Sequence, residues 1–151
     1  MALLTDEHLA WIGVEEASIT ITIARRDIQK YAAATEQLQD KYVRGDEAPP
    51  MFIFNLFSDI APLAALRDDG LARGGGRGPR LPLKRIMAGG TEIRQHLPIC
   101  PGDVLTGTRR VVDMYEKAGR TGPLIFTVRE LAITNAAGDA VMEETQTSIA
   151  R

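Results

Sequence analysis

The feature of this sequence that most limits its fold is a succession of β-rich runs after Pro82. The runs cover residues 86–99, 103–117, 123–134 and 140–150, and turn residues separate them at 98–102, 119–123 and 135–139. Each run mixes β-branched and polar residues, and strands joined by such short connections are antiparallel. The second half of the chain is therefore predicted to form an antiparallel sheet.

The first half mixes helix and strand signals. A short helix is expected after Thr5, and a strand is expected over 18–24, where isoleucines alternate with Ser and Thr. Asp27 stands as a candidate N-cap before residues 28–39, whose Ala, Gln and Glu content favours a helix.

The longest apolar stretch runs from Met51 to Leu66 and follows Pro49 and Pro50, which suit a first helical turn. It is apolar on nearly every side, a pattern typical of a helix surrounded by other elements, and Pro62 is expected to end or kink it. Together with the strands, this predicts an α+β fold in which a curved sheet wraps around a long central helix.

Residues 67–80 are rich in Gly and Arg without apolar periodicity and are expected to form a flexible loop in a single domain spanning 1–151. The net charge of −2 gives no overall basic field for nucleic acid or anionic membranes. No basic segment precedes an apolar run at the N-terminus, and one unpaired cysteine, Cys100, agrees with a reducing compartment. A cytoplasmic location is expected.

Residue patterns alone point to no active site. The glycine-rich segment lacks the Lys-Ser/Thr pair of a P-loop, and prolines keep His96 and Cys100 from sharing a helical face, so no metal site is expected. The adjacent acids Glu15/Glu16 and Glu143/Glu144 point to opposite faces of a strand and are expected on solvated faces.

Several ordered segments nevertheless resemble a known family. These are DIQKYAAAT at 27–35, EAPPMF at 47–52, and MAGGTEIRQHLPICPGD at 87–103 followed by the run from Tyr115 to Pro123. Together they resemble the N-terminal-type domain of the MaoC-like dehydratase family, akin to fungal-synthase dehydratase domains. The resemblance implies a hotdog fold, a tendency of two hotdogs to pair, and hydration or dehydration of acyl thioesters without a metal or redox cofactor.

Working hydratases of this family carry a motif of the form Y-A-x-A-x-G-D-x-N-P-x-H, whose Asp and His handle the water and the α-proton. Aligned without gaps from Tyr31, the motif's Gly falls on Glu36, its Asp on Gln37 and its His on Tyr42. A glutamine cannot act as a carboxylate base, and a tyrosine ordinarily titrates near 10. The resemblance therefore implies a degenerate half that needs a catalytic partner, and because the chain stops at Arg151 we expect a separate subunit, or a homodimer when the chain is alone.

The resemblance also implies a substrate-binding set, with coenzyme A or a carrier protein holding the acyl group. The thioester would meet backbone N–H groups after Pro50, near Met51, and the Gly89–Gly90 pair belongs to the same set. Phosphate groups would need local cations, for which the candidates are Lys84, Arg85, Arg94, Lys117 and Arg120.

Two other functions stay open. Hotdog domains also host thioesterases, which use a carboxylate or polar residue on the central helix, and Asp59 is the candidate carboxylate here. Alternatively, the domain is a non-enzymatic module that binds acyl-CoA.

Overall fold

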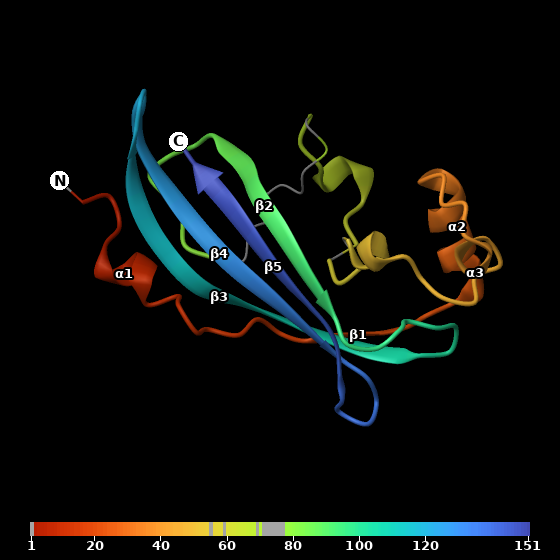
Figure 1. Ribbon diagram of the computed structural model, residues 1–151. Helices are drawn as coiled ribbons and strands as arrows, with labels where there is room; N and C mark the ends of the chain where they lie inside the picture. Colours follow the sequence, from red (N-terminus) through yellow and green to blue (C-terminus); the bar gives the residue numbers. More distant parts are fainter. Residues whose placement is uncertain (1, 55, 59, 69, 71–77) are drawn as a thin grey trace.

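The computed structural model describes residues 2–54, 56–58, 60–68, 70 and 78–151. Its strands form one antiparallel five-stranded sheet in the order β1-β3-β4-β5-β2. The sheet curves, and the α2 and α3 helices lie beside one end of it (Figure 1). The elements in chain order are α1 Asp6–Leu9, β1 Ile19–Thr22, α2 Arg25–Ala34, α3 Asp40–Val43, the 3-10 turns η1 Pro50–Ile53 and η2 Leu63–Ala65, β2 Ile86–Gln95, β3 Val104–Gly119, β4 Gly122–Thr134 and β5 Ala140–Ala150.

The strands lie where the sequence predicts them, and the α+β class is confirmed. The connections are also as expected: β3 and β4 are joined by a tight hairpin, and the turn before β5 is closed by the Asn135 side chain, whose Oδ1 accepts the Ala137 and Asp139 N–H groups at 3.0 and 2.9 Å. The β-rich runs and the turn residues between them therefore located the sheet correctly.

The long central helix predicted over 50–66 is wrong. Among the described residues of this segment, only the turns η1 and η2 form, and the chain leaves helical geometry at Phe54, whose φ and ψ are −59° and 120°. Phe52, Ile53 and Phe57 are buried in the core, whereas Ile60 and Leu63 are fully or largely exposed. The apolar side chains divide between the core and the surface, so uniform hydrophobicity did not indicate a helix enclosed on all sides.

The boundaries of the preceding helix also differ from those predicted. The N-cap of α2 is Ala24, and Asp27 lies in the first turn, where its carboxylate faces the positive end of the helix dipole. The helix ends after Ala34 instead of running to residue 39. Glu36 stops it by adopting a left-handed conformation with φ +52°.

The main core lies between one half of the sheet and the segments that precede β2. Ile28 from α2, Phe52 and Ile53 from η1, and Phe57 pack against apolar residues of β3, β4 and β5. Gly107 in β3 makes this approach possible, because a Cβ there would lie 2.5 Å from Cδ1 of Phe57. The residues contributed by the three strands are Leu105, Leu131, Ile133, Val141 and Met142.

The two edges of the sheet differ. Along β3 the N-terminal segment covers the edge, with β1 pairing to residues 104–107 and bridges joining Ile12 to Val111 and Glu15 to Arg110. At the other edge, β2 pairs only with β5, and its residues are exposed on both faces except for a half-buried Ile93. Among the described residues, no helix is long and apolar enough to cross a membrane.

Candidate functional site

The segment that resembles the catalytic motif begins in α2. Ala32 is buried there, and the Tyr31 ring meets the Phe52 ring edge to face with centroids 5.7 Å apart. Burial raises the pKa of the Tyr31 phenol. These contacts anchor α2 to the core, and they therefore set the position at which the following loop begins.

The loop after α2 makes a turn at the residue that aligns with the motif's glycine. Glu36, aligned with the motif's glycine, holds a left-handed φ of +52°. Gln37 follows it, with its backbone N–H bonded to the Ala32 carbonyl at 2.9 Å and its side-chain amide donating to the Thr35 carbonyl at 3.4 Å. Tyr42 lies in α3 and is buried, with the Lys41 ammonium 4.9 Å from its ring centroid. In the gapless alignment, this neutral amide and this buried phenol fall on the motif's carboxylate and imidazole.

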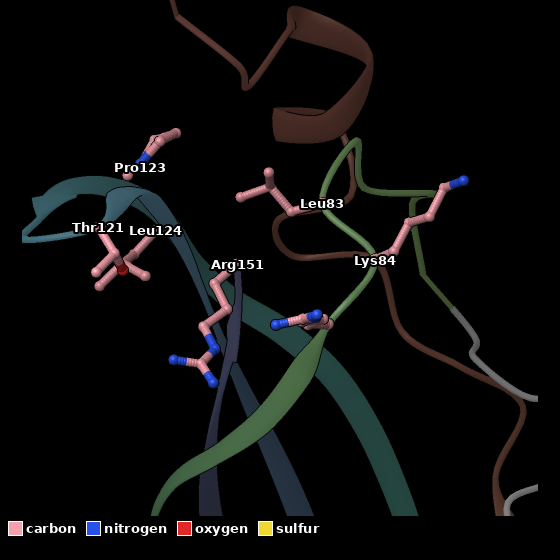
Figure 2. Close-up of a pocket in the computed structure, with 8 residues that line it drawn as sticks. Leu83, Lys84, Thr121, Pro123, Leu124 and Arg151 are labelled. Atoms are coloured by element: carbon pink, nitrogen blue, oxygen red, sulfur yellow. The ribbon is translucent and has the colours of Figure 1, made fainter.

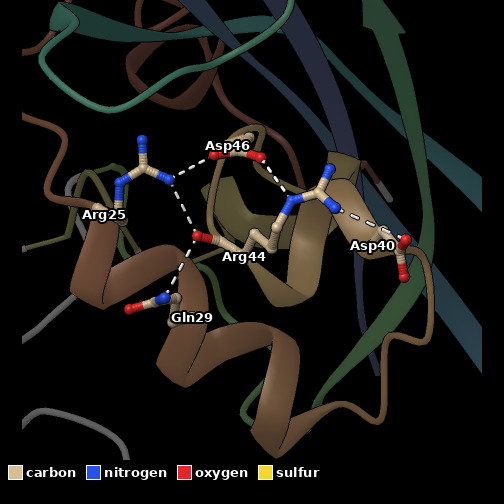
Figure 3. Close-up of polar contacts among 5 residues, drawn as sticks. All are labelled: Arg25, Gln29, Asp40, Arg44 and Asp46. Atoms are coloured by element: carbon tan, nitrogen blue, oxygen red, sulfur yellow. Dashed lines mark hydrogen bonds and ion pairs between the residues drawn. The ribbon is translucent and has the colours of Figure 1, made fainter.

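Ion pairs tie the two helices of this site together (Figure 3). Asp46 accepts hydrogen bonds from Arg25 at 2.5 Å and from Arg44 at 2.9 Å, and these two guanidinium groups lower the pKa of its carboxyl. The Arg44 carbonyl also accepts bonds from Arg25 and from the Gln29 amide, at 3.0 and 3.2 Å. Because α2 and α3 are bound through both backbone and side chains, the loop between them is held in one geometry.

Met51 lies in η1, a turn of only four residues, and is 42% exposed. The expected oxyanion site depended on a helix opening after Pro50, and the part of that segment which the structure describes forms 3-10 turns instead. A single 3-10 turn lacks the aligned peptide dipoles of a long helix. Asp59, the thioesterase candidate, lies outside the described residues.

The glycines and cations of the predicted binding set are distributed over two regions. Gly89 is the extra residue of a bulge in β2, and a Cβ on it would meet Thr147 and Ile149 at 3.1 Å, which gives it a packing role. Gly90 has open space around it. Arg94, further along β2, pairs with Glu92 at 3.3 Å.

The other predicted cations gather at the opposite end of the sheet from α2 and α3. Lys84 lines a pocket of about 660 Å³, and Arg120 lies in the β3–β4 hairpin next to the pocket residue Thr121 (Figure 2). Lys117 lies over the stacked rings of Tyr115 and Phe126, 5.2 and 5.1 Å from their centroids. The structure therefore brings Lys84, Lys117 and Arg120 to one end and leaves Arg94 apart from them.

Sequence reasoning missed two residues. Arg151 completes the cationic lining of this pocket together with Arg85. Glu144 was expected on a solvated face, but it is only 4% exposed, and burial raises the pKa of its carboxyl while the nearby Arg109 lowers it. Alternation placed Glu143 and Glu144 on opposite faces of the strand, but it did not show that the face of Glu144 is covered. In the part of the chain that the structure describes, no group of His, Cys, Asp or Glu side chains could hold a metal ion.

Comparisons with known proteins agree with this geometry. The sequence model of the family described as "FAS1-like, dehydratase domain region" matches residues 10–144. Mesaconyl-C(4)-CoA hydratase of Chloroflexus aurantiacus is 31% identical over 121 residues, which cover 80% of this chain and 42% of that protein. The chain thus spans less than half the length of this curated relative.

Solved structures share the fold. The R-hydratase PhaJ1 of Pseudomonas aeruginosa superposes with a TM-score of 0.59 at 21% identity, covering 92% of this chain and 81% of that one. The HadBC (3R-hydroxyacyl-ACP dehydratase) complex and the ChsH1-ChsH2 complex, both of Mycobacterium tuberculosis, give TM-scores of 0.60 and 0.63 at 16% and 15% identity. They cover 92% and 90% of this chain, and 96% and 83% of theirs. With its hotdog fold and the family match over most of its length, the chain belongs to the FAS1-like dehydratase-domain family of MaoC-like proteins.

Proposed function

We propose that this domain is the non-catalytic half of an enoyl-CoA hydratase or 3-hydroxyacyl thioester dehydratase, and that a partner hotdog with an intact motif supplies the Asp and His. One observation carries the proposal. The loop after α2 makes a left-handed turn at Glu36, and in the gapless alignment Gln37 and Tyr42 fall on the positions of the acid–base pair. A domain with this fold but without the pair contributes binding surface to a reaction centred elsewhere.

The relatives support the reaction class. The curated relative is named a hydratase of a CoA thioester, and HadBC is named a dehydratase complex of acyl carrier protein thioesters. Two of the similar structures are complexes of two named components.

The open edge of β2 suits the partner. It carries exposed apolar side chains at its start, Ile86 at 61% and Met87 at 44% exposure. On its outer side, β2 pairs with no other strand among the residues that the structure describes. Such an edge is ready to extend the sheet with a strand from another hotdog.

The test uses crotonyl-CoA and the loss of its enoyl-thioester absorbance. The chain alone should give no hydration, and the chain co-purified with a hotdog protein bearing D-x-N-P-x-H should hydrate crotonyl-CoA. Within that heteromer, Gln37→Ala and Tyr42→Phe in this chain should leave kcat within about twofold, whereas Ala at the partner's Asp or His should lower it by two or more orders of magnitude.

Two results would overturn the proposal. Hydration by the isolated chain at a rate comparable to the heteromer would place the chemistry here. Release of free thiol from acyl-CoA by the isolated chain, followed with a thiol reagent, would instead indicate a thioesterase.

A further inference from the structure

The charged side chains of this protein are distributed unevenly along the sheet. At the end where β2 starts, β5 ends and β3 turns into β4, residues 78–91, 117–128 and 145–151 contain no Asp or Glu. This end holds six of the chain's 18 basic residues and none of its 20 acidic ones, although the net charge is −2. We call it the cationic end, and its basic residues are Arg80, Lys84, Arg85, Lys117, Arg120 and Arg151.

The positive charge of the cationic end is not neutralised within the part of the chain that the structure describes. All six side chains are exposed, and none of them forms an ion pair with a described residue. Arg85 and Arg151 exchange both backbone hydrogen bonds, at 3.1 and 2.9 Å, so two like charges lie opposite each other. Glu116, next to Lys117 in β3, instead accepts the N–H groups of Leu3 and Leu4 at 2.7 and 2.6 Å.

Apolar side chains lie in the row next to these cations on the outer face of the sheet, away from the core. The strand registers align four of them across β3, β4, β5 and β2, namely Tyr115, Phe126, Ile149 and Met87. Two residues along each strand, the next row consists of Lys117, Leu124, Arg151 and Arg85. Because every second residue of a strand shares a face, the two rows are neighbours on one surface.

The loop before β2 and the β3–β4 hairpin extend this mixed surface beyond the strands. Figure 2 shows Leu83 next to Lys84, and Pro123 and Leu124 of the hairpin near Arg151. Pro123 is exposed, and Leu83 and Leu124 are half-buried. Contact through the loop and the hairpin does not require the β2 edge, which the partner hotdog would use.

The mixture of groups indicates the class of the partner. Nucleic-acid sites combine cations with aromatic rings on which bases stack, but the Tyr115 and Phe126 rings stack on each other, 4.9 Å apart, with the Lys117 ammonium over both. A small soluble anion would leave the apolar row uncovered. An anionic lipid surface provides both environments, because its headgroups attract Lys and Arg while aromatic and aliphatic side chains enter the interface between them.

We propose that the cationic end docks this domain on membrane surfaces that carry anionic lipids. The proposal does not depend on the function proposed above. The negative surface potential attracts the six basic side chains, and Leu83 and Pro123 then contact the headgroup layer. Figure 1 shows α2 and α3 at the opposite end of the sheet, so the degenerate loop lies away from the docked end. The contact is peripheral, because no helix among the described residues is long and apolar enough to cross a membrane.

Flotation of the full chain with vesicles tests the charge. Vesicles of phosphatidylcholine and phosphatidylglycerol in equal parts should bind the chain, and phosphatidylcholine alone should not. Lys84→Gln and Arg120→Gln should each lower the partition coefficient about fivefold. Lys30→Gln, 65% exposed on α2 at the other end, should not change it. Binding should be lost at about 1 M salt, where the Debye length is about 3 Å. No binding to the mixed vesicles, equal binding to both vesicle types, or full binding by both cation variants would overturn the proposal.

A second set of measurements separates a membrane surface from a soluble anion. Leu83→Ser and Pro123→Ser keep every charge and remove an apolar contact, so each should also weaken binding to the mixed vesicles. Pro123 is exposed, so its variant gives the result even where Leu83→Ser lowers the stability. Glycerol phosphate at constant ionic strength should not displace the chain. Displacement by glycerol phosphate, or unchanged vesicle binding by both serine variants, would assign the cations to a soluble anion and contradict the proposal.

Discussion

Glu36 shows what a residue-by-residue alignment can predict. Placing the motif without gaps puts a glycine position on Glu36, and the structure gives that residue a left-handed φ of +52°. An L-residue with a Cβ is strained in this region, by about 1–2 kcal/mol. The helix predicted over 28–39 therefore ends earlier than the residue pattern indicated, at a position that the motif alignment assigns to a glycine.

Replacing Glu36 with glycine should stabilise the domain. The change removes the clash of Cβ with the backbone, and part of the gain is lost to the greater flexibility of glycine in the unfolded chain. We expect the free energy of unfolding to rise by about 0.5–1 kcal/mol in urea denaturation. Glu36→Ala keeps the Cβ and should give no such rise; an equal gain for both variants would mean that the side chain, not the backbone, was unfavourable.

Glu144 marks the limit of residue-level reasoning. Alternation assigns Glu143 and Glu144 to opposite faces, but only the packed sheet decides that Glu144 faces inward, in register with Leu131 of β4 and Ile93 of β2. A carboxyl enclosed in this way loses hydration, and the charged form loses more than the neutral form does.

The burial of Glu144 predicts a pH dependence of stability. Its folded-state pKa is raised above the ordinary value of 4.5, so the native state favours the protonated carboxyl. The stability that protonation of Glu144 contributes is fully present below pH 4.5 and is lost as the pH rises through the folded-state pKa. The test measures the free energies of unfolding of Glu144→Gln and of the wild type across about pH 4 to 8. The value for Glu144→Gln should rise relative to the wild-type value as the pH increases.

The half-exposed neighbour provides the control for this measurement. Oε2 of Glu143 lies 3.6 Å from Nε2 of His96, and 41% of the Glu143 side chain is exposed. Glu143→Gln should not reproduce the rising difference. Parallel stability curves for Glu144→Gln and the wild type would show that the raised pKa of Glu144 does not affect folding.

Among the elements, the strands could be predicted from the sequence, whereas the conformation of the segment 50–66 could not. Strand periodicity is local, so 123–134 and 140–150 were located almost to the residue. The run over 50–66 has no such local signature, because continuous hydrophobicity fits a buried helix as well as an irregular segment. Phe57 reaches the core from a turn instead of a helix, which depends on the space that Gly107 leaves in β3.

The contact between Gly107 and Phe57 can be tested directly. Gly107→Ala should lower the free energy of unfolding by about 1–3 kcal/mol, because the new methyl group displaces the Phe57 ring from the core. Adding Phe57→Leu should recover part of that loss in a double-mutant cycle. Gly90→Ala is the matched control in another strand, with open space around it, and should change stability by less than about 0.5 kcal/mol. Equal effects at both glycines would argue against a specific clash.

At the scale of the whole molecule, the main feature is that one edge of the sheet is covered and the other is open. The N-terminal segment protects β3, while β2 is exposed on both faces and carries apolar side chains at its start. The composition gave no sign of this asymmetry, nor of the cationic end of a chain with net charge −2, because both arise from where the strands bring residues together.

The open edge predicts self-association when no partner is present. The isolated chain should form a dimer, and lysines at Ile86 and Met87 should convert it to a monomer, since charged edges resist pairing. Light scattering coupled to gel filtration gives the masses. Ile12→Lys with Val14→Lys, on the covered edge, should remain dimeric. A wild type that stays monomeric at every concentration, or charged β2 variants that still dimerise, would show that this edge does not pair.

The bulge in β2 has a further consequence for how such domains diverge. Gly89 is inserted between Ala88, which pairs with Ser148, and Gly90, which pairs with Thr147. Directly opposed residues share a face, so Ala88 and Gly90 already lie on the faces of Ser148 and Thr147, and deleting Gly89 would make them consecutive residues without exchanging any face. A change in chain length by a single codon could thus straighten the edge strand while every pairing with β5 is kept. The bulge is therefore a point at which the length of the edge strand can change without loss of its contact pattern.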